Sequence, residues 1–363
     1  MWAGGQGAEM KIGEKIDSIR VLLLAGLTEV ILALPALRAL RVHFPSTRIT
    51  VLTSPAGSEL LQTIPWLDEA IAIGRFRKGE LFELATGYRT IRSIRHLRQL
   101  RQEGLGPDLQ IDLSGGLSTA LLRYLTGSAF FGASGTAGLI EKNVSLLRQG
   151  SDLHLAHDYL RRLEPLGVRP VIATPELSTN PEANLRIERM LRRLGIESGH
   201  LLIGLHPGRG CGTGEAGENG WPIDRFVALG QRLVHQYDAR LLILAGPGEE
   251  QRRRRLAAAL PRKETIRVET LPLLDLLSLT ARLSLLIANA GAVPHLGAAV
   301  GVPVVAISLS ARPSPTEVLN ERTITIRAPH FDQPDLHNEE AVFYAAAQLL
   351  SLNRSGLFRD FQR

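Results

Sequence analysis

The chain has 363 residues, enough for two domains of ordinary size, and 44% of them are hydrophobic while only 5% are aromatic. This composition favours an α/β protein with a large aliphatic core. The formal charge of +6 suggests an acidic partner such as a nucleotide, a phosphorylated substrate or an anionic membrane face, and no usual nucleic-acid-binding signature is present. The single cysteine, Cys211, excludes an internal disulfide framework, no apolar run reaches transmembrane length, and the N-terminal residues show no apolar h-region of the signal-peptide kind. We therefore expect a soluble cytoplasmic protein, with residues 1–17 as a flexible tail.

Short apolar runs alternate with helical patterns along the first half of the chain. This alternation is typical of buried parallel strands joined by helices. After the first strand we expect a helix with Thr28 as its N-cap and Glu29 in its first turn, where a carboxylate suits the helix dipole. The predicted strands cover residues 19–24, 48–53, 70–73, 109–113 and a short stretch within 127–138, and the predicted helices cover about 29–42, 58–63, 117–125 and 154–166.

Arginine recurs at every third position in the stretch TGYRTIRSIRHLRQLRQ. Its members are Arg89, Arg92, Arg95, Arg98 and Arg101. On a helix this spacing makes a basic stripe that winds slowly around the axis. The stripe is compatible with a solvated helix face and with contact to an anionic acceptor or a membrane surface.

The second half of the chain repeats the alternation. Predicted strands cover residues 201–205, 240–244, 266–268, 285–288, 304–307 and 322–326, and predicted helices cover 224–235, 249–260, 273–280, 295–300 and 339–351. Residues 285–307 read as a strand, a turn of small residues, a helix and a second strand. Because ligands of open α/β sheets bind at the carboxyl ends of strands, this turn is where we expect a bound phosphate.

Two such arrays, joined by an extended stretch at 167–181, predict two doubly wound α/β domains that face each other across a cleft. We place the N-terminal domain at 18–166, a linker and connecting helix at 167–197, and the C-terminal domain at 198–335. Residues 336–363 are expected to form a C-terminal helix that packs back on the N-terminal domain.

Four stretches, in the family's order, resemble glycosyltransferase family 9, the ADP-heptose:lipopolysaccharide heptosyltransferases. They read RVLLLAGLTEVILALPALRALRVHFPSTRITVLTSP, then HPG with WPIDRFVALGQRL, then LAGPGEE, and finally LPLLDLLSLTARLSLLIANAGAVPHLGAAVGVPVVAI. The resemblance spans residues 20 to about 310. It implies a GT-B fold in which the N-terminal domain binds the acceptor and the C-terminal domain binds a nucleotide sugar.

The resemblance places the catalytic base in the first helix. The family's G-D-V pattern, whose Asp is the proposed base, falls on Thr28, Glu29 and Val30. Glutamate keeps the carboxylate but is one methylene longer, so base catalysis remains open with a shifted geometry. The alternative is that Glu29 only satisfies backbone N–H groups. The expected acceptor-binding residues are Thr28, Arg89, Arg92 and Arg95.

The resemblance also implies a donor site in which several motif positions differ from the family. The N-D-[ST]-G-x-x-H motif falls on residues 289–295, where Ala290 and Gly291 replace a carboxylate and a hydroxyl. Asn219 stands where the family has a phosphate-binding lysine, and Arg209 is a candidate to replace that charge. Glu249 matches a ribose contact or simply starts a helix, and His295 contacts phosphate or packs. The expected donor-binding residues are His206, Gly208, Arg209, Asn219, Gly246, Gly248, Glu249, Asn289, Gly291, Ala292 and His295.

We therefore expect an inverting, metal-independent glycosyltransferase without a cofactor. Its donor would be a nucleotide-diphosphate sugar, ADP-linked in the family, and its acceptor an anionic sugar or glycolipid reached at the inner face of the membrane. A catalytically silent nucleotide-sugar-binding protein is the alternative, because three chemical positions are changed. A Rossmann oxidoreductase is disfavoured because no strand leads into G-x-G-x-x-G with an acidic residue at the expected spacing.

Overall fold

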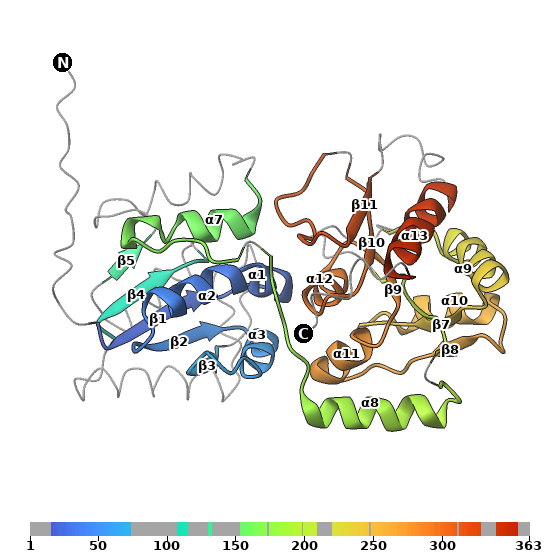
Figure 1. Cartoon of the computed structure of the whole chain (residues 1–363), viewed down its shortest axis with the longest axis horizontal. Coiled ribbons are helices and arrows are strands. Elements are labelled where there is room, and N and C mark those ends of the chain that lie inside the picture. Colours follow the sequence, from blue (N-terminus) through green and yellow to red (C-terminus); the bar gives the residue numbers. More distant parts are fainter. Residues whose placement is uncertain are drawn as a thin grey trace, which may run out of the picture.

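Two parallel sheets form the frame of the chain (Figure 1). The structure, a computed structural model, describes residues 16–73, 107–114, 130–132, 153–172, 174–197, 199–208, 220–246, 248–310, 312–327 and 339–354. The first sheet has the order β3-β2-β1-β4-β5 and the second the order β11-β10-β9-β6-β7-β8. Neighbouring strands pair in parallel in both sheets. The prediction of two doubly wound α/β sheets is confirmed.

The first sheet is built on its central strand, whose last five residues are all buried. Its strands are β1 (Ser18–Leu23), β2 (Arg48–Thr53), β3 (Glu69–Ala72), β4 (Leu109–Asp112) and β5 (Phe130–Gly132). Its described helices are α1 (Leu27–Leu32), α2 (Leu34–His43), α3 (Pro55–Leu61) and α7 (Leu155–Arg161), followed by the 3-10 turn η1 (Glu164–Leu166). Burial on both faces explains why these strands are continuous apolar runs.

The expected N-cap of the first helix is wrong by two residues. Gly26 is the N-cap of α1, in an extended conformation with φ −70° and ψ 171°, and its carbonyl accepts a hydrogen bond from the N–H of Val30 at 3.0 Å. Thr28 therefore lies inside the first turn and caps nothing. The single helix expected here is also divided at Ala33, because Pro35 in the first turn of α2 has no N–H to donate to the preceding turn.

The second sheet carries its helices in the same alternation. Its strands are β6 (Leu202–His206), β7 (Arg240–Ile243), β8 (Thr265–Arg267), β9 (Leu285–Asn289), β10 (Val304–Ser308) and β11 (Thr323–Arg327). Its helices are α8 (Pro181–Arg193), α9 (Ile223–Tyr237), α10 (Glu250–Ala259), α11 (Leu273–Thr280), α12 (Ala292–Ala299) and α13 (Glu339–Arg354). The helix expected from His295 begins three residues earlier, at Ala292, so the small residues belong to its first turn.

The C-terminal helix does not pack on the N-terminal domain as expected. α13 lies against α9 and against β9, β10 and β11 of the second sheet (Figure 1). Its buried side chains, among them Val342, Phe343 and Leu349, share one apolar cluster with Phe226 and Leu233 of α9. The helix thus covers apolar surface of its own domain, which explains why the prediction of a return to the first domain is wrong.

The two domains are joined through apolar contacts as well as through the linker. α1 packs against α12, and α3 packs against α11. Leu277, Leu296 and Ala299 of the second domain belong to the cluster that forms the core of the first. The N–H of Leu177, in the linker, donates to the carbonyl of Ala299 at 2.8 Å. The carboxylate-bearing turn of α1 is therefore held beside α12.

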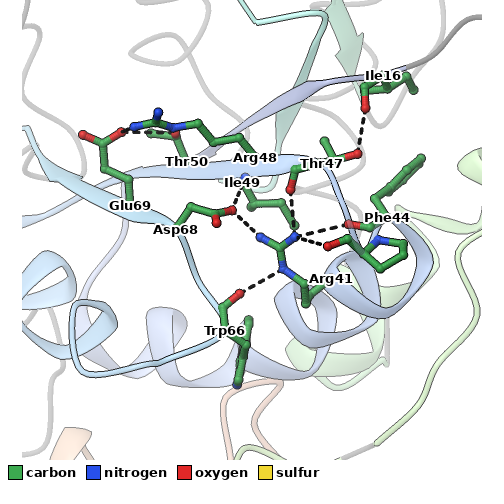
Figure 2. Close-up of polar contacts among 11 residues, drawn as sticks. Ile16, Arg41, Phe44, Thr47, Arg48, Ile49, Thr50, Trp66, Asp68 and Glu69 are labelled. Carbon is green, nitrogen blue, oxygen red and sulfur yellow. Dashed lines mark hydrogen bonds and ion pairs between the residues drawn. The ribbon is translucent and has the colours of Figure 1, made fainter.

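One arginine fastens the amino-terminal edge of the first sheet. The guanidinium of Arg41, at the end of α2, donates to the carbonyls of Trp66, Phe44, Pro45 and Thr47 at 2.9, 3.3, 3.0 and 2.7 Å. It also pairs with the carboxylate of Asp68, which accepts from the N–H of Ile49 at 2.7 Å. Figure 2 shows Arg41 among the labelled residues of this network. These contacts lie where β2 begins, away from the carboxyl ends of the strands, and so serve the fold.

Candidate active site

The strand orders fix two places where ligands of such sheets bind. In the first sheet the chain winds outward from β1 to β2 and β3, and β4 and β5 lie on the other side of β1. In the second sheet it winds from β6 to β7 and β8, while β9, β10 and β11 lie on the other side of β6. Ligands of doubly wound sheets bind at the carboxyl ends of the two strands that flank this reversal. The candidate places are therefore the ends of β1 and β4, and the ends of β6 and β9.

Glu29 lies at the first of these places, in the first turn of α1. Its carboxylate turns back over Gly26, because a Cβ atom at residue 26 would lie 2.8 Å from Glu29 Oε2. Within the described part of the chain, no backbone N–H donates to this carboxylate, so the helix-capping alternative is not observed. The turn is tied to the neighbouring strand by a hydrogen bond of 2.5 Å from the N–H of Leu24 to Ser114 Oγ.

Asp158 and Tyr159 of α7, together with Arg162 after it, form a polar group that the sequence did not single out, and Tyr159 feels the charge of Glu29. Arg162, which follows α7, donates to Asp158 Oδ2 from Nε at 2.9 Å and to the carbonyl of Leu113, after β4, at 2.9 Å. Tyr159 is 3% exposed. Burial, and then the carboxylates of Glu29 and Asp158, raise the pKa of Tyr159, so its phenol remains protonated. A helical pattern alone gave no signal for this group.

A histidine and a glutamate meet at the second place. His206, the last residue of β6, has its Nε2 3.0 Å from Glu249 Oε2. The same oxygen accepts from the N–H of Gly246, after β7, at 2.7 Å. A Cβ atom at residue 208 would lie 2.3 Å from Glu249 Oε1 and 2.4 Å from His206 Cε1, so only Gly208 fits beside the pair. Glu249 is thus bonded inward, and it is the N-cap residue of α10, the helix start that the sequence offered as the alternative to a ribose contact.

The side chain of Asn289, at the end of β9, forms hydrogen bonds with the backbone of two separate segments. Its Nδ2 donates to the carbonyls of Gly208 at 2.9 Å and Pro207 at 3.3 Å, and its Oδ1 accepts from the N–H of Trp221 at 3.1 Å. Arg252 of α10 donates to the carbonyls of Pro207 at 2.8 Å and Trp221 at 3.4 Å. Asn289 is 3% exposed. Its side chain therefore positions the turn after β6 next to the start of α9.

The turn into α12 provides backbone groups and an inward histidine. Gly291 is the N-cap, at φ 156° and ψ −164°, and Ala292 begins the helix. His295 is 4% exposed, and its Nε2 lies 3.1 Å from the carbonyl oxygen of Thr316. Burial lowers the pKa of His295 to about 4, so the imidazole is neutral. The ring is buried and its Nε2 is bonded within the protein, which is the packing role that the sequence offered as the alternative to a phosphate contact.

Two neutral histidines join the domains beside this turn. His154, the N-cap of α7, accepts from the N–H of Ala156 at Nδ1 and donates to the carbonyl of Glu317 at 2.8 Å from Nε2. With His295 on Thr316 and the N–H of Leu155 on the carbonyl of Pro315 at 2.7 Å, three consecutive carbonyls are bound. Burial lowers the pKa of His154. The segment 315–317 therefore holds α7 and α12 together.

Some of the remaining expected site residues lie in the part of the chain that the structure describes, and others lie outside it. Gly246 and Gly248 lie before α10, and Gly248 has φ +83°, which favours glycine. Arg209, Asn219, Arg89, Arg92 and Arg95 lie outside the described residues.

Within the described ranges, His, Cys, Asp and Glu side chains form no group of three or more that could hold a metal ion. No described helix is long and apolar enough to cross a membrane.

Solved structures of similar fold fit the chain over nearly its whole length. A glycosyl transferase family 9 structure from Veillonella parvula has 20% identity and a TM-score of 0.76, and covers 92% of this chain and 97% of its own. Escherichia coli ADP-heptose lps heptosyltransferase II has 17% identity and a TM-score of 0.69, covering 93% of this chain and 99% of its own. E. coli heptosyltransferase WaaC with ADP has 16% identity and a TM-score of 0.69, covering 92% and 99%. No curated protein sequence matches the chain.

The two parallel sheets, together with the similarity to these solved structures, show that the chain has a GT-B fold. The model of glycosyltransferase family 9 (heptosyltransferase) matches residues 210–343, which include His295 and most of the second sheet. The match assigns residues 210–343, in the C-terminal domain, to glycosyltransferase family 9, and it supports a glycosyltransferase.

Proposed function

We propose that the protein transfers a sugar, heptose or a related one, from a nucleotide-diphosphate donor to an acceptor hydroxyl. The reaction is a direct displacement with inversion at the anomeric carbon. Glu29 accepts the hydroxyl proton, and no metal takes part. The family match supports the transfer, and two similar structures carry ADP-heptose or ADP in their names.

The observation that carries this proposal is the contact between α1 and α12. α1 bears Glu29 at the carboxyl end of β1, and α12 follows the carboxyl end of β9. The carboxylate of Glu29 is half-buried and accepts no hydrogen bond from the described residues, as a base that must receive a proton requires. Because α1 and α12 are in contact, Glu29 can accept a proton from an acceptor while the turn before α12 binds the phosphates of the donor.

The donor would be bound mainly by backbone groups. The first N–H groups of α12 have no intrahelical partner and favour anions, and the first turn of α12 contains no acidic side chain to oppose a diphosphate. The turn 206–208, held by Asn289, adds groups on the other side of the strand reversal. We propose an ADP-linked sugar as the donor because the structural neighbours are named for ADP-heptose and ADP.

The acceptor would meet the first domain near Thr28 and Glu29. The formal charge of +6 favours an anionic sugar or glycolipid, which the arginines at 89, 92 and 95 would contact. Such an acceptor would bring the protein from the cytoplasm to the inner face of a membrane. If the acceptor is anionic, added salt should lower the rate of transfer, whereas transfer to an uncharged acceptor should depend little on salt.

A catalytically silent nucleotide-sugar-binding protein is the second candidate. Three side chains expected at the donor, Glu249, Asn289 and His295, form hydrogen bonds within the protein. Ala290 and Gly291 also lack the carboxylate and the hydroxyl of the family motif. Binding of a nucleotide sugar without any turnover would favour this candidate.

A thermal-shift screen with ADP, GDP, UDP, dTDP and their sugars tests the donor. A ligand at a hundred times its Kd adds about 2.7 kcal/mol of apparent stability. We expect ADP and an ADP-sugar to raise Tm and the other nucleotides to have smaller effects. The same screen on Gly208→Ala is the control, because a Cβ there collides with His206 and Glu249. If no nucleotide raises the wild-type Tm, the transferase proposal is wrong.

A further inference from the structure

A turn of the second domain reaches α7 of the first. It covers residues 314–317, in the connection from β10 to β11, and is called here the bridging turn. The turn is braced from inside, because the N–H of Ser314 donates to Glu317 Oε1 at 3.1 Å and the N–H of Glu317 donates to the carbonyl of Ser314 at 3.1 Å. Arg327 of β11 donates to the same carboxylate oxygen from Nε at 2.8 Å. The shape of the bridging turn is therefore set by its own domain.

The bridging turn presents three consecutive carbonyls to other elements. Two of them accept from the first domain. The N–H of Leu155 donates to the carbonyl of Pro315 at 2.7 Å, and His154 Nε2 donates to the carbonyl of Glu317 at 2.8 Å. The carbonyl between them accepts from His295 of α12 at 3.1 Å. One short turn thus connects the start of α7 to the helix whose first turn is the expected phosphate site.

The side chain of His154 makes two hydrogen bonds with different purposes. Its Nδ1 accepts from the N–H of Ala156 at 3.3 Å and so carries no hydrogen. A neutral imidazole then carries its hydrogen on Nε2, which must be the donor to the carbonyl of Glu317. The first bond caps α7 within its own domain, and the second joins the two domains.

The contact through the bridging turn is directional, whereas the larger contacts between the domains are apolar. α1 packs on α12 and α3 packs on α11, with Leu277 and Leu296 in the shared cluster. Burial of apolar surface stabilises the joined domains without favouring one orientation strongly. A hydrogen bond weakens steeply as its angle and distance change. The bridging turn is therefore suited to fixing how the domains are oriented.

The other end of α7 is tied to the turn that leads to Glu29. Arg162, after α7, donates to the carbonyl of Leu113 at 2.9 Å. The next residue, Ser114, accepts from the N–H of Leu24 at 2.5 Å through its Oγ. Leu24 stands between β1 and α1, which bears Glu29. A shift of α7 relative to the bridging turn would therefore move the proposed base relative to the donor.

We propose that His154 is a positioning residue, whose hydrogen bond from Nε2 to the carbonyl of Glu317 sets the orientation of Glu29 toward the turn before α12. This inference rests on the proposed function and adds to it a residue that touches neither substrate. A displacement of about 1 Å between reacting groups can slow catalysis by about a hundredfold. Loss of this hydrogen bond should therefore lower the rate of transfer and leave donor binding, which belongs to the second domain, unchanged.

Two substitutions separate the two hydrogen bonds of His154. In His154→Asn the shorter side chain still accepts from the N–H of Ala156, since asparagine is a favoured N-cap, but it does not reach Glu317. In His154→Gln the amide nitrogen falls near the place of Nε2 and can donate to Glu317, while the cap is lost. We expect His154→Asn to lower kcat at least about tenfold with unchanged affinity for ADP, and His154→Gln to keep most of the wild-type kcat.

A purely structural role would give the opposite order. If His154 only caps α7, both Tm and kcat should fall in His154→Gln and stay unchanged in His154→Asn, and that result would overturn the proposal. His235→Asn, at an exposed position of α9, is the matched control and should keep the wild-type kcat.

Distances between spin labels test the joint without any substrate. Val42→Cys on α2 and Tyr344→Cys on α13 place labels at exposed positions of the two domains, in a Cys211→Ser background. We expect a narrow distance distribution in this labelled parent and with His154→Gln, and a broader one with His154→Asn. Equal widths in the parent and with His154→Asn would overturn the role of His154 and leave the proposed function standing. If the wild-type protein transfers no sugar, the proposed function fails and the positioning role fails with it.

Discussion

Asn289 and Trp221 are joined by a hydrogen bond of 3.1 Å from the backbone N–H of Trp221 to Oδ1 of Asn289, across 68 residues of sequence. The Nδ2 of the same amide reaches the carbonyls of Pro207 and Gly208. One buried side chain thus fastens the end of β6 to the start of α9 at the strand reversal where a donor would bind. Its contribution to stability is therefore measurable apart from any ligand.

We expect Asn289→Leu to lower the free energy of unfolding by about 3 kcal/mol, because it removes the buried hydrogen bonds of Asn289 to the N–H of Trp221 and to the carbonyls of Pro207 and Gly208. Urea unfolding measures the change. The matched control is Asn184→Leu, since Asn184 makes a hydrogen bond of 2.9 Å to Thr179 Oγ1 at a part-buried position. That variant should lose less than about 1 kcal/mol. Equal losses in both variants would show that Asn289 has no special positioning role.

Substitutions that restore the family motif in the turn before α12 should not stabilise the protein. Gly291 has φ 156° and ψ −164°, a region that side chains disfavour, so Gly291→Ser should destabilise by about 1–3 kcal/mol. Ala290 is exposed, and Ala290→Asp should change stability by less than about 0.5 kcal/mol. Thermal unfolding of both variants measures this difference. A stable Gly291→Ser protein with tighter ADP binding would mean that the turn readily adopts another conformation.

Arg41 should support the fold without affecting the donor. Its side chain is 14% exposed and binds four carbonyls and Asp68, so Arg41→Met should cost about 3 kcal/mol. Arg48, on the same edge of the sheet, pairs with Glu69 at 3.1 Å but is 67% exposed (Figure 2). Arg48→Met should therefore cost less than about 1 kcal/mol. Chemical unfolding would reveal the ordering, and a reversed order would contradict the network as described.

The pKa of His295 predicts a loss of stability in acid. Its pKa is about 4 in the folded protein, against an ordinary value of 6.5, because burial disfavours the imidazolium. The unfolded chain then binds more protons than the folded one between these values, so stability is complete above about pH 6.5 and is lost as pH falls toward 4. At 1.36 kcal/mol per unit the loss is at most about 3 kcal/mol. His154, whose pKa is also lowered, adds to the loss in the same direction.

Unfolding measured at pH 7 and pH 4.5 tests this prediction in three proteins. His295→Gln can still donate to the carbonyl of Thr316 but does not titrate, so it should lose less stability in acid than wild type. His235→Gln, at an exposed position, should follow wild type. A His295→Gln protein as acid-sensitive as wild type would assign the effect to other groups.

The sheets could be predicted from the sequence because a buried parallel strand is an apolar run that ends in turn residues. Residues 48–53 and 273–280 were predicted with the boundaries that the structure gives to β2 and α11. The packing of α13 could not be predicted, because an amphipathic helix shows that it has a partner but not which one. Its partner was the domain that precedes it in sequence.

The side-chain roles at the donor site were less predictable than the positions. His206, Glu249 and Asn289 were expected at one place, and the structure brings them to the ends of neighbouring strands. Their hydrogen bonds, however, join residues 43, 68 and 81 positions apart, and no local pattern encodes such partners. Tyr159 was missed for the same reason, since its raised pKa depends on burial in the folded protein and on the carboxylate of Glu29, which is distant in sequence.

The most direct test of the account is the rate of nucleoside diphosphate release from the donor found in the thermal-shift screen, compared between wild type and Glu29→Gln with acceptor present. Glu59→Gln, at an exposed position of α3, is the matched control and should keep the wild-type rate. We expect Glu29→Gln to bind the donor with unchanged affinity and to transfer at least about a hundredfold more slowly, the usual effect of removing a general base. Transfer by Glu29→Gln at the wild-type rate would contradict the assignment of Glu29 as the base.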